Sequence, residues 1–272
     1  MAIDQDAIAA ALAAAQRFRI WKAALALEST GAFGSLWKVA GIPVASTLTP
    51  GLGGTVPTRA TVGALGQANA SGANNLYALQ AVLSGSLAVS VIFADRKWAN
   101  SAMSGIVTTT DTTLGATADV DRPDGSTPNE MWIEVNSAFG STGATLSVEY
   151  TAIDGTANRH ATLVHPVGGA SGAPAAGMMF PMTLEGTDQG VRRPTAYHWS
   201  ISTGTAGDFG VVVLERKVEM PIPQAGVPTL LDWADLGLAN FPDDECIMMI
   251  AQGNTANSGT LAGRFAIGEM TP

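Results

Sequence analysis

Acidic side chains come closest to the spacing of a metal site in this chain. Asp119, Asp121, Asp124 and Glu130 gather in one stretch, and calcium prefers several carboxylates in one flexible loop. The helix–loop–helix calcium pattern needs oxygen ligands at positions 1, 3 and 5, but position 5 counted from Asp119 is Pro123. We therefore interpret residues 119–130 as a solvated acidic turn and keep calcium binding as an alternative.

Other catalytic motifs are incomplete. His160, His165 and His198 lack helical i, i+4 spacing and have no neighbouring cysteine, so a zinc site is not expected. Ser35 and Lys38 match a Ser-x-x-Lys pair, but the Lys-Thr-Gly element that accompanies it is missing. We predict no enzymatic activity, no metal and no cofactor.

Adjacent carboxylates leave one enzymatic alternative open. Asp243 and Asp244 could perform acid–base chemistry if they faced a cleft. A glycosidase also lines its cleft with aromatic side chains, which make up only 6% of this chain. Carbohydrate hydrolysis is therefore the least favoured alternative.

Charge is scarce and unevenly distributed. Charged residues make up 14% of the 272 residues, against about 25% in an ordinary soluble domain. Residues 1–100 hold seven Lys/Arg and four Asp/Glu, whereas residues 101–272 hold seven and nineteen, which gives +3 and −12. A basic first third beside an acidic body favours docking onto acidic surfaces and argues against nucleic-acid binding.

Cysteine and targeting signals add little. Cys246 lies in an apolar run and is expected to be a small core residue, and a single cysteine excludes an internal disulfide. Asp4 and Asp6 occupy the place of a positive signal-peptide region, and no window of about 18 uncharged apolar residues occurs. We expect a protein made in the cytoplasm, without a membrane segment.

The first 75 residues are predicted to form a helix and an arm. Residues 4–28 are rich in alanine, and their apolar residues recur near the helical period, with Gly31 as the expected C-cap. Residues 31–75 are dense in glycine and proline, which argues against regular structure. We expect an extended arm that a neighbouring subunit holds in place.

The remaining residues, 76–272, are predicted to be a β body. Residues 131–135 and 145–151 alternate with period two, Asp154-Gly155 forms a turn, and residues 159–164 return as a strand. We further expect strands at 87–93, 180–184, 196–202, 209–214, 246–251 and 261–267, with a hairpin joining 196–202 to 209–214. Residues 168–177 read as an internal boundary, and residues 230–238 as a short second helix starting at Asp232. Short strands separated by glycine-rich turns predict an antiparallel, jelly-roll-like β-sandwich.

Several segments resemble known proteins. Residues 180–192 read FPMTLEGTDQGVR, residues 202–214 read STGTAGDFGVVVL, and residues 33–43 read FGSLWKVAGIP. Together with residues 255–267, these are similar to segments of virion structural proteins of tailed bacteriophages. The resemblance implies a capsid decoration, neck or tail component of the virion, without catalytic residues.

These features together predict a non-enzymatic virion component, with capsid decoration or the head–tail region favoured. Its partners would be copies of itself and other virion proteins, namely major capsid or neck and tail proteins. The predicted interface residues are Phe18, Trp21, Phe33, Trp37 and Lys38, because aromatic and cationic side chains anchor such contacts. The alternative is a carbohydrate-binding or adhesive β-module of tail-fibre or receptor-binding type, with or without a dependence on calcium. Because such a component belongs to a virion, we expect it to be made in the host cytoplasm and to reside in the virion.

Overall fold

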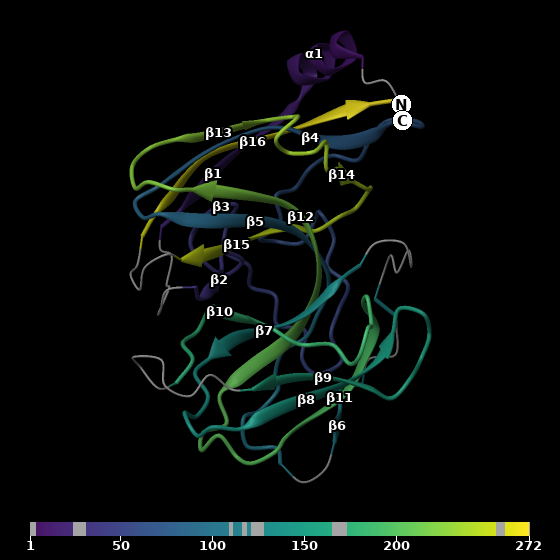
Figure 1. Ribbon diagram of the computed structural model, residues 1–272, viewed down its shortest axis with the longest axis vertical. Helices are drawn as coiled ribbons and strands as arrows, with labels where there is room; N and C mark the ends of the chain where they lie inside the picture. Colours follow the sequence, from purple (N-terminus) through teal and green to yellow (C-terminus); the bar gives the residue numbers. More distant parts are fainter. Residues whose placement is uncertain are drawn as a thin grey trace.

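The computed structural model describes residues 4–23, 31–108, 111–115, 119–120, 128–164, 173–253 and 259–271. The prediction of a mainly β, antiparallel fold with an N-terminal helix is confirmed. The strands stack in three layers, a six-stranded sheet, a closed six-stranded barrel and a four-stranded sheet (Figure 1). The arrangement is that of a sandwich whose middle layer is a barrel. Within these residues, no helix is long and apolar enough to cross a membrane.

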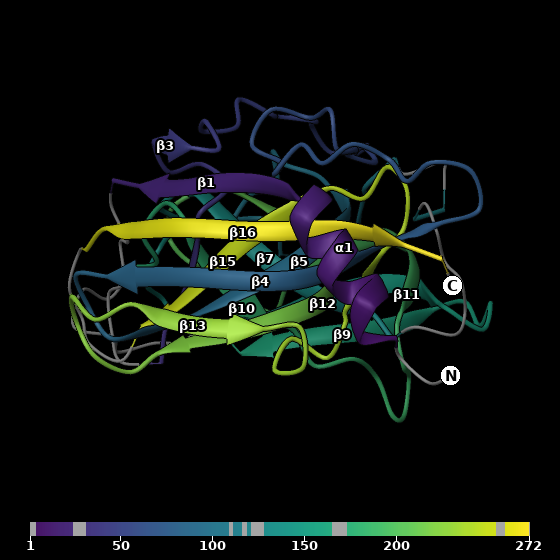
Figure 2. The same cartoon turned by 90° about the horizontal axis from the view of Figure 1, so that it is seen from above.

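The six-stranded sheet forms one end of the molecule. Its strands are β13 (Thr229–Asp232), β4 (Asn75–Gly85), β16 (Leu261–Met270), β1 (Gln16–Lys22) and β3 (Gly41–Ile42) in that order, with β14 (Asn240–Phe241) also paired to β4. The single described helix, α1 (Gln5–Ala14), lies across the outer face of this sheet (Figure 2). Asp4 caps the helix by accepting a hydrogen bond from the Asp6 backbone N–H at 2.9 Å.

The expected helix over residues 4–28 is too long. Helix α1 ends at Ala14, and β1 follows at once, paired antiparallel with β16. In β1 Phe18 and Ile20 turn inward, while Arg17 and Arg19 point outward. This period-two pattern and the hydrogen bonds to β16 outweigh the helical spacing of the apolar residues. The last expected helical residues, 24–28, lie outside the described part of the chain.

The barrel is the central layer. Its strands, in order around the barrel, are β10 (Met178–Pro181), β2 (Phe33–Ser35), β15 (Ile247–Gly253), β5 (Val89–Ala99), β12 (Asp208–Ile222) and β7 (Glu130–Ser137). β7 pairs with both β12 and β10 and so closes the ring. Phe93 of β5 stacks on Phe265 of β16 with ring centroids 4.4 Å apart, in the core that joins the barrel to the six-stranded sheet.

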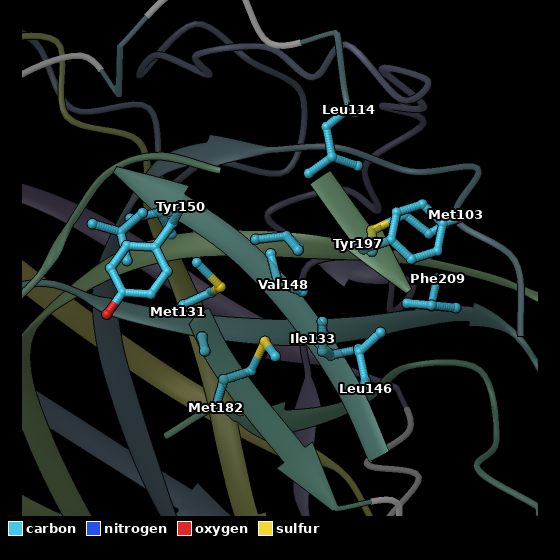
Figure 3. Close-up of a cluster of buried hydrophobic side chains, with 14 of the residues drawn as sticks. Met103, Leu114, Met131, Ile133, Leu146, Val148, Tyr150, Met182, Tyr197 and Phe209 are labelled. Atoms are coloured by element: carbon cyan, nitrogen blue, oxygen red, sulfur yellow. The ribbon is translucent and has the colours of Figure 1, made fainter. Parts of the chain in front are cut away.

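The four-stranded sheet covers the opposite side of the barrel. Its order is β6 (Thr112–Thr113), β11 (Val191–Trp199), β8 (Thr145–Ala152) and β9 (Arg159–Val164). The predicted β8–β9 hairpin with its turn at Asp154-Gly155 is confirmed. Figure 3 shows the core between this sheet and the barrel, where Leu146 and Val148 face Met131, Ile133 and Phe209.

The predicted hairpin between residues 196–202 and 209–214 is wrong. β11 belongs to the four-stranded sheet, where it pairs with β6 and β8, whereas β12 belongs to the barrel. β12 is 15 residues long, so its first half packs toward the four-stranded sheet and its second half toward the six-stranded sheet. The segment between β11 and β12 is thus a crossover between layers.

The short second helix expected at residues 230–238 is also absent. Thr229–Asp232 forms β13, and turns follow it. The Asp232 carboxylate accepts hydrogen bonds from the backbone N–H groups of Ala234 and Asp235, at 2.9 and 3.2 Å. Aspartate therefore caps a turn here, as it would cap a helix, but no helix continues.

Residues 31–75 lie against the chain's own barrel. Leu36, Ala64 and Leu65 are buried, and the backbone N–H of Leu65 donates to the Ile247 carbonyl at 3.0 Å. β1 and β2 pair with strands from the second half of the sequence, β16, β15 and β10. The expected neighbouring subunit is therefore not needed to order this segment, because the barrel supplies the contacts.

Candidate interaction surface

The outer face of the six-stranded sheet combines arginines with exposed apolar side chains. We term the following set the arginine face: Arg17, Arg19 and Trp21 on β1, Ile42 on β3, Leu230 on β13 and Arg264 on β16. All six side chains are classed as exposed. The inward faces of the same strands are buried in the core.

The strand register places these residues next to one another. Trp21 lies directly opposite Ile42 on one side and Ala262 on the other, and Arg19 lies opposite Arg264. Leu230 follows in the same row through Val82 of β4. The face therefore continues across the strands from β3 to β13.

Helix α1 covers only part of this sheet. Ala11 and Ala15 pack on Leu79 and Ala266, at one end of the outer face. Figure 2 shows the helix crossing β16 and β4 near that end, with the other half of these strands not overlaid by α1. Trp21, Ile42 and Leu230 remain 43%, 39% and 59% exposed, respectively.

Electrostatics make this face unfavourable in an isolated chain. Arg19 and Arg264 are directly opposed like charges, which destabilise a strand pair. Neither arginine forms an ion pair with any acidic side chain in the described ranges, and Arg17 donates to the backbone carbonyl of Leu12 at 2.9 Å. An acidic partner surface would neutralise three guanidinium groups at once.

Of the five predicted interface residues, only Trp21 lies on this face. Phe18 points into the core below it, and Phe33 packs edge-on against Trp132 with ring centroids 4.8 Å apart. Trp37 is 1% exposed, and Arg96 lies over its ring, so it offers almost no surface to a partner. Lys38 is half-buried and donates a hydrogen bond to Asn136.

In the described part of the acidic stretch considered for calcium, the carboxylates form ion pairs with arginines. The Asp119 carboxylate pairs with both Arg192 and Arg193, and Arg193 above all holds the pKa of this carboxyl below its ordinary value. Glu130 accepts from Arg216 at 2.9 Å. Residues 121–127, with Asp121 and Asp124, lie outside the described part of the chain.

The remaining candidates for chemistry are dispersed. The Nδ1 of His198 lies 2.6 Å from Asp111 on the four-stranded sheet, and Ser35 donates to buried Glu134 inside the barrel. Asp244 pairs with Arg59 at the surface. Cys246 is buried, which confirms its prediction as a core residue.

Comparisons with known proteins return structural likenesses only. No family model matches the chain, and no curated protein matches it. Among solved structures, the subviral particle of infectious bursal disease virus VP2 aligns at 10% identity with a TM-score of 0.20, over 95% of this chain and 80% of that one. The Gx strain of the same virus aligns at 13% identity with a TM-score of 0.19, over 95% and 82%. At these TM-scores the likenesses do not identify a shared fold.

Proposed function

We propose that this protein is a non-enzymatic structural component of a bacteriophage virion that assembles through its arginine face. The observation that carries the proposal is an uncovered sheet face bearing Trp21, Arg19 and Arg264 on a chain with a net charge of −9. Tryptophan and arginine are enriched at the energetic centres of protein interfaces. Capsid decoration or the head–tail region is the favoured place in the virion, because residues 33–43, 180–192 and 202–214 resemble segments of such components.

The partner we infer is the acidic surface of another copy or of a neighbouring virion protein. Residues 101–272 carry nineteen acidic and seven basic side chains, so each copy offers both signs of charge. A basic face of one copy against an acidic surface of the next is a contact between different patches. A contact between different patches repeats from one copy to the next. It forms a ring if the rotation between copies closes and an open filament if it does not.

Point substitutions test this better than truncation. Removing the first 60 residues would also remove β1 from the six-stranded sheet and β2 from the barrel. Charge reversal by Arg19→Glu together with Arg264→Glu should abolish self-association, whereas Arg19→Lys with Arg264→Lys should preserve it. Sedimentation velocity over a protein concentration series measures the effect.

The apolar part of the face has its own test. Trp21→Ala should weaken association about 30-fold, since truncating an interfacial tryptophan costs about 2 kcal/mol. Ile106→Ala is the matched control, because Ile106 is equally exposed but lies in the loop beyond β5, away from the six-stranded sheet.

Two results would overturn the proposal. One is a wild-type chain that stays monomeric at every concentration and also fails to bind particles of its phage that lack this protein. The other is binding to anionic vesicles or to nucleic acid without any association between protein chains. Electron microscopy of the associated protein should show regular, symmetric objects, and amorphous aggregates would contradict the proposal.

A further inference from the structure

A cluster of buried charged residues joins three neighbouring strands of the barrel. Asp95 and Lys97 belong to β5, Glu215 and Lys217 belong to β12, and Glu245 precedes β15. Asp95 lies opposite Glu215 on one side and Ile247 on the other. The two lysine and three acidic side chains are at most 9% exposed.

The two ammonium groups lie within hydrogen-bond distance of three carboxylate oxygens of this cluster. Lys97 Nζ lies 2.8 Å from Glu215 Oε2 and 3.9 Å from Asp95 Oδ2. Lys217 Nζ lies 2.7 Å from Glu215 Oε1 and 2.8 Å from Glu245 Oε1. The second oxygen of Glu245, Oε2, is buried and has no hydrogen-bond partner within the described chain.

The charges in this cluster do not balance. Among these five described residues, three carboxylates and two ammonium groups leave one negative charge if all five ionise, and an excess of buried charge is costly. Oxygens of Asp95, Glu215 and Glu245 lie within 4.8 Å of one another, near enough to share one cation. A metal ion would have to enter beside two ammonium groups, whereas a proton on a carboxylate balances the charge without displacing anything.

We propose that Glu245 holds one proton at neutral pH, and that its loss in alkaline solution loosens the attachment of residues 59–67 to the barrel. Gln67 donates through Nε2 to the Glu245 carbonyl at 2.7 Å. At the solvent edge Arg59 pairs with Asp244, the neighbour of Glu245. Residues 59–67 are therefore joined directly to the peptide that carries the titrating group.

The surroundings of Glu245 explain the direction of its titration. Burial raises the pKa of Glu245 to about 8, the negative charge of Asp95 adds to this, and Lys217 only partly offsets it. Burial opposes the charged form of Lys217 too, but Glu245 and Glu215 hold its pKa above the ordinary value. As the pH rises, the proton therefore leaves the Glu245 carboxyl group, and the Lys217 ammonium group stays charged.

Stability should consequently fall as the pH rises from 4.5 to about 8 and level off above that. The folded-state pKa of Glu245, about 8, lies above its ordinary value of 4.5. The unfolded chain releases this proton first, so this contribution is fully present below pH 4.5 and is lost as pH rises through 8. Within that window the unfolding equilibrium constant should increase about tenfold per pH unit from this group.

Urea unfolding between pH 6 and pH 9 tests the proposal, with Glu245→Gln as the decisive variant. Glutamine imitates the protonated acid, so the tenfold dependence per pH unit should disappear and the variant should exceed the wild type in stability at pH 9. Glu219→Gln, at an exposed position on β12, is the matched control and should keep the wild-type slope. The protection factors of residues 59–67 in hydrogen exchange, which are corrected for the base-catalysed intrinsic rate, should fall at high pH in the wild type only.

Three outcomes would overturn the proposal. They are an unchanged slope in Glu245→Gln, a wild type without pH dependence in this window, and an alkaline loss that a divalent cation reverses. Should Glu245→Gln fail to fold, the carboxyl carbon of Glu245 in wild-type protein can be followed by NMR. A midpoint near the ordinary value of a glutamate would then refute the proton assignment.

Discussion

The ion pair inside the barrel gives the sharpest stability prediction. Arg96 Nη2 donates to Glu134 Oε2 at 2.6 Å, with both side chains 3% exposed. Glu134 also accepts from the Ser35 hydroxyl, and the Arg96 guanidinium carbon lies 5.0 Å from the Trp37 ring centroid. Arg96→Met should cost about 3–5 kcal/mol, because it leaves the Glu134 carboxylate buried without its counter-charge.

The magnitude depends on Glu134 being ionised, and its surroundings indicate that it is. Burial raises the pKa of Glu134, but Arg96, Ser35 and Lys38 together hold it below the ordinary value of 4.5. A depressed acid pKa contributes stability that is present above 4.5 and is lost as pH falls through the folded-state value. The cost of Arg96→Met should therefore shrink as the pH falls and Glu134 becomes protonated.

A double-mutant cycle followed by urea unfolding separates the pair from simple packing loss. Arg96→Met with Glu134→Met removes both charges, so the double variant should be more stable than either single variant. Arg59→Met at the exposed Arg59–Asp244 pair is the control and should cost less than about 1 kcal/mol. If the two single costs simply add in the double variant, the coupling inferred from the geometry is wrong.

Two further predictions concern single positions. Lys22 is buried and donates to the Val39 and Pro43 carbonyls, and burial lowers its pKa from 10.5 to about 8; stability should therefore rise between pH 8 and 10.5, and Lys22→Met should remove this rise in urea unfolding. A slope that persists in the variant would refute this. Gly210→Ala should cost about 3 kcal/mol, because the added carbon would overlap the Asn100 carbonyl. Gly53→Ala is the control, because its added carbon meets nothing closer than 3.8 Å. In thermal melts of both variants, Gly53→Ala should lower the melting temperature far less than Gly210→Ala.

Local alternation predicts the strands of this fold well where one face is buried. β8 and β9 match residues 145–151 and 159–164 because their side chains alternate and a tight turn joins them. β1 was misjudged because Phe18 and Trp21 fit a helical stripe as well as a strand. Only the distant partner strand β16, supplied from the other end of the chain, resolves that ambiguity.

The arginine face could be predicted only in part. Trp21 was expected at an interface, and the sequence Arg17-Phe18-Arg19-Ile20-Trp21 carries the alternating signal that places arginines on one side. Arg264 is brought opposite Arg19 by strand pairing across the whole chain length, which no local pattern reveals. Trp37 was misjudged for the opposite reason, because burial depends on a barrel assembled from six separate segments.

Several of the scarce charged side chains of this protein lie in its interior. Only 37 side chains are Asp, Glu, Lys or Arg, and seven of these are buried in the described chain: Lys22, Asp95, Arg96, Lys97, Glu134, Glu215 and Glu245. The other 30 charged side chains are left for the rest of the chain. In a chain with only 14% charged residues, two directly opposed arginines beside an exposed tryptophan are a concentrated feature. A partner that covers them would remove both the like-charge repulsion and the exposed apolar area, so assembly and stability of this sheet should rise together.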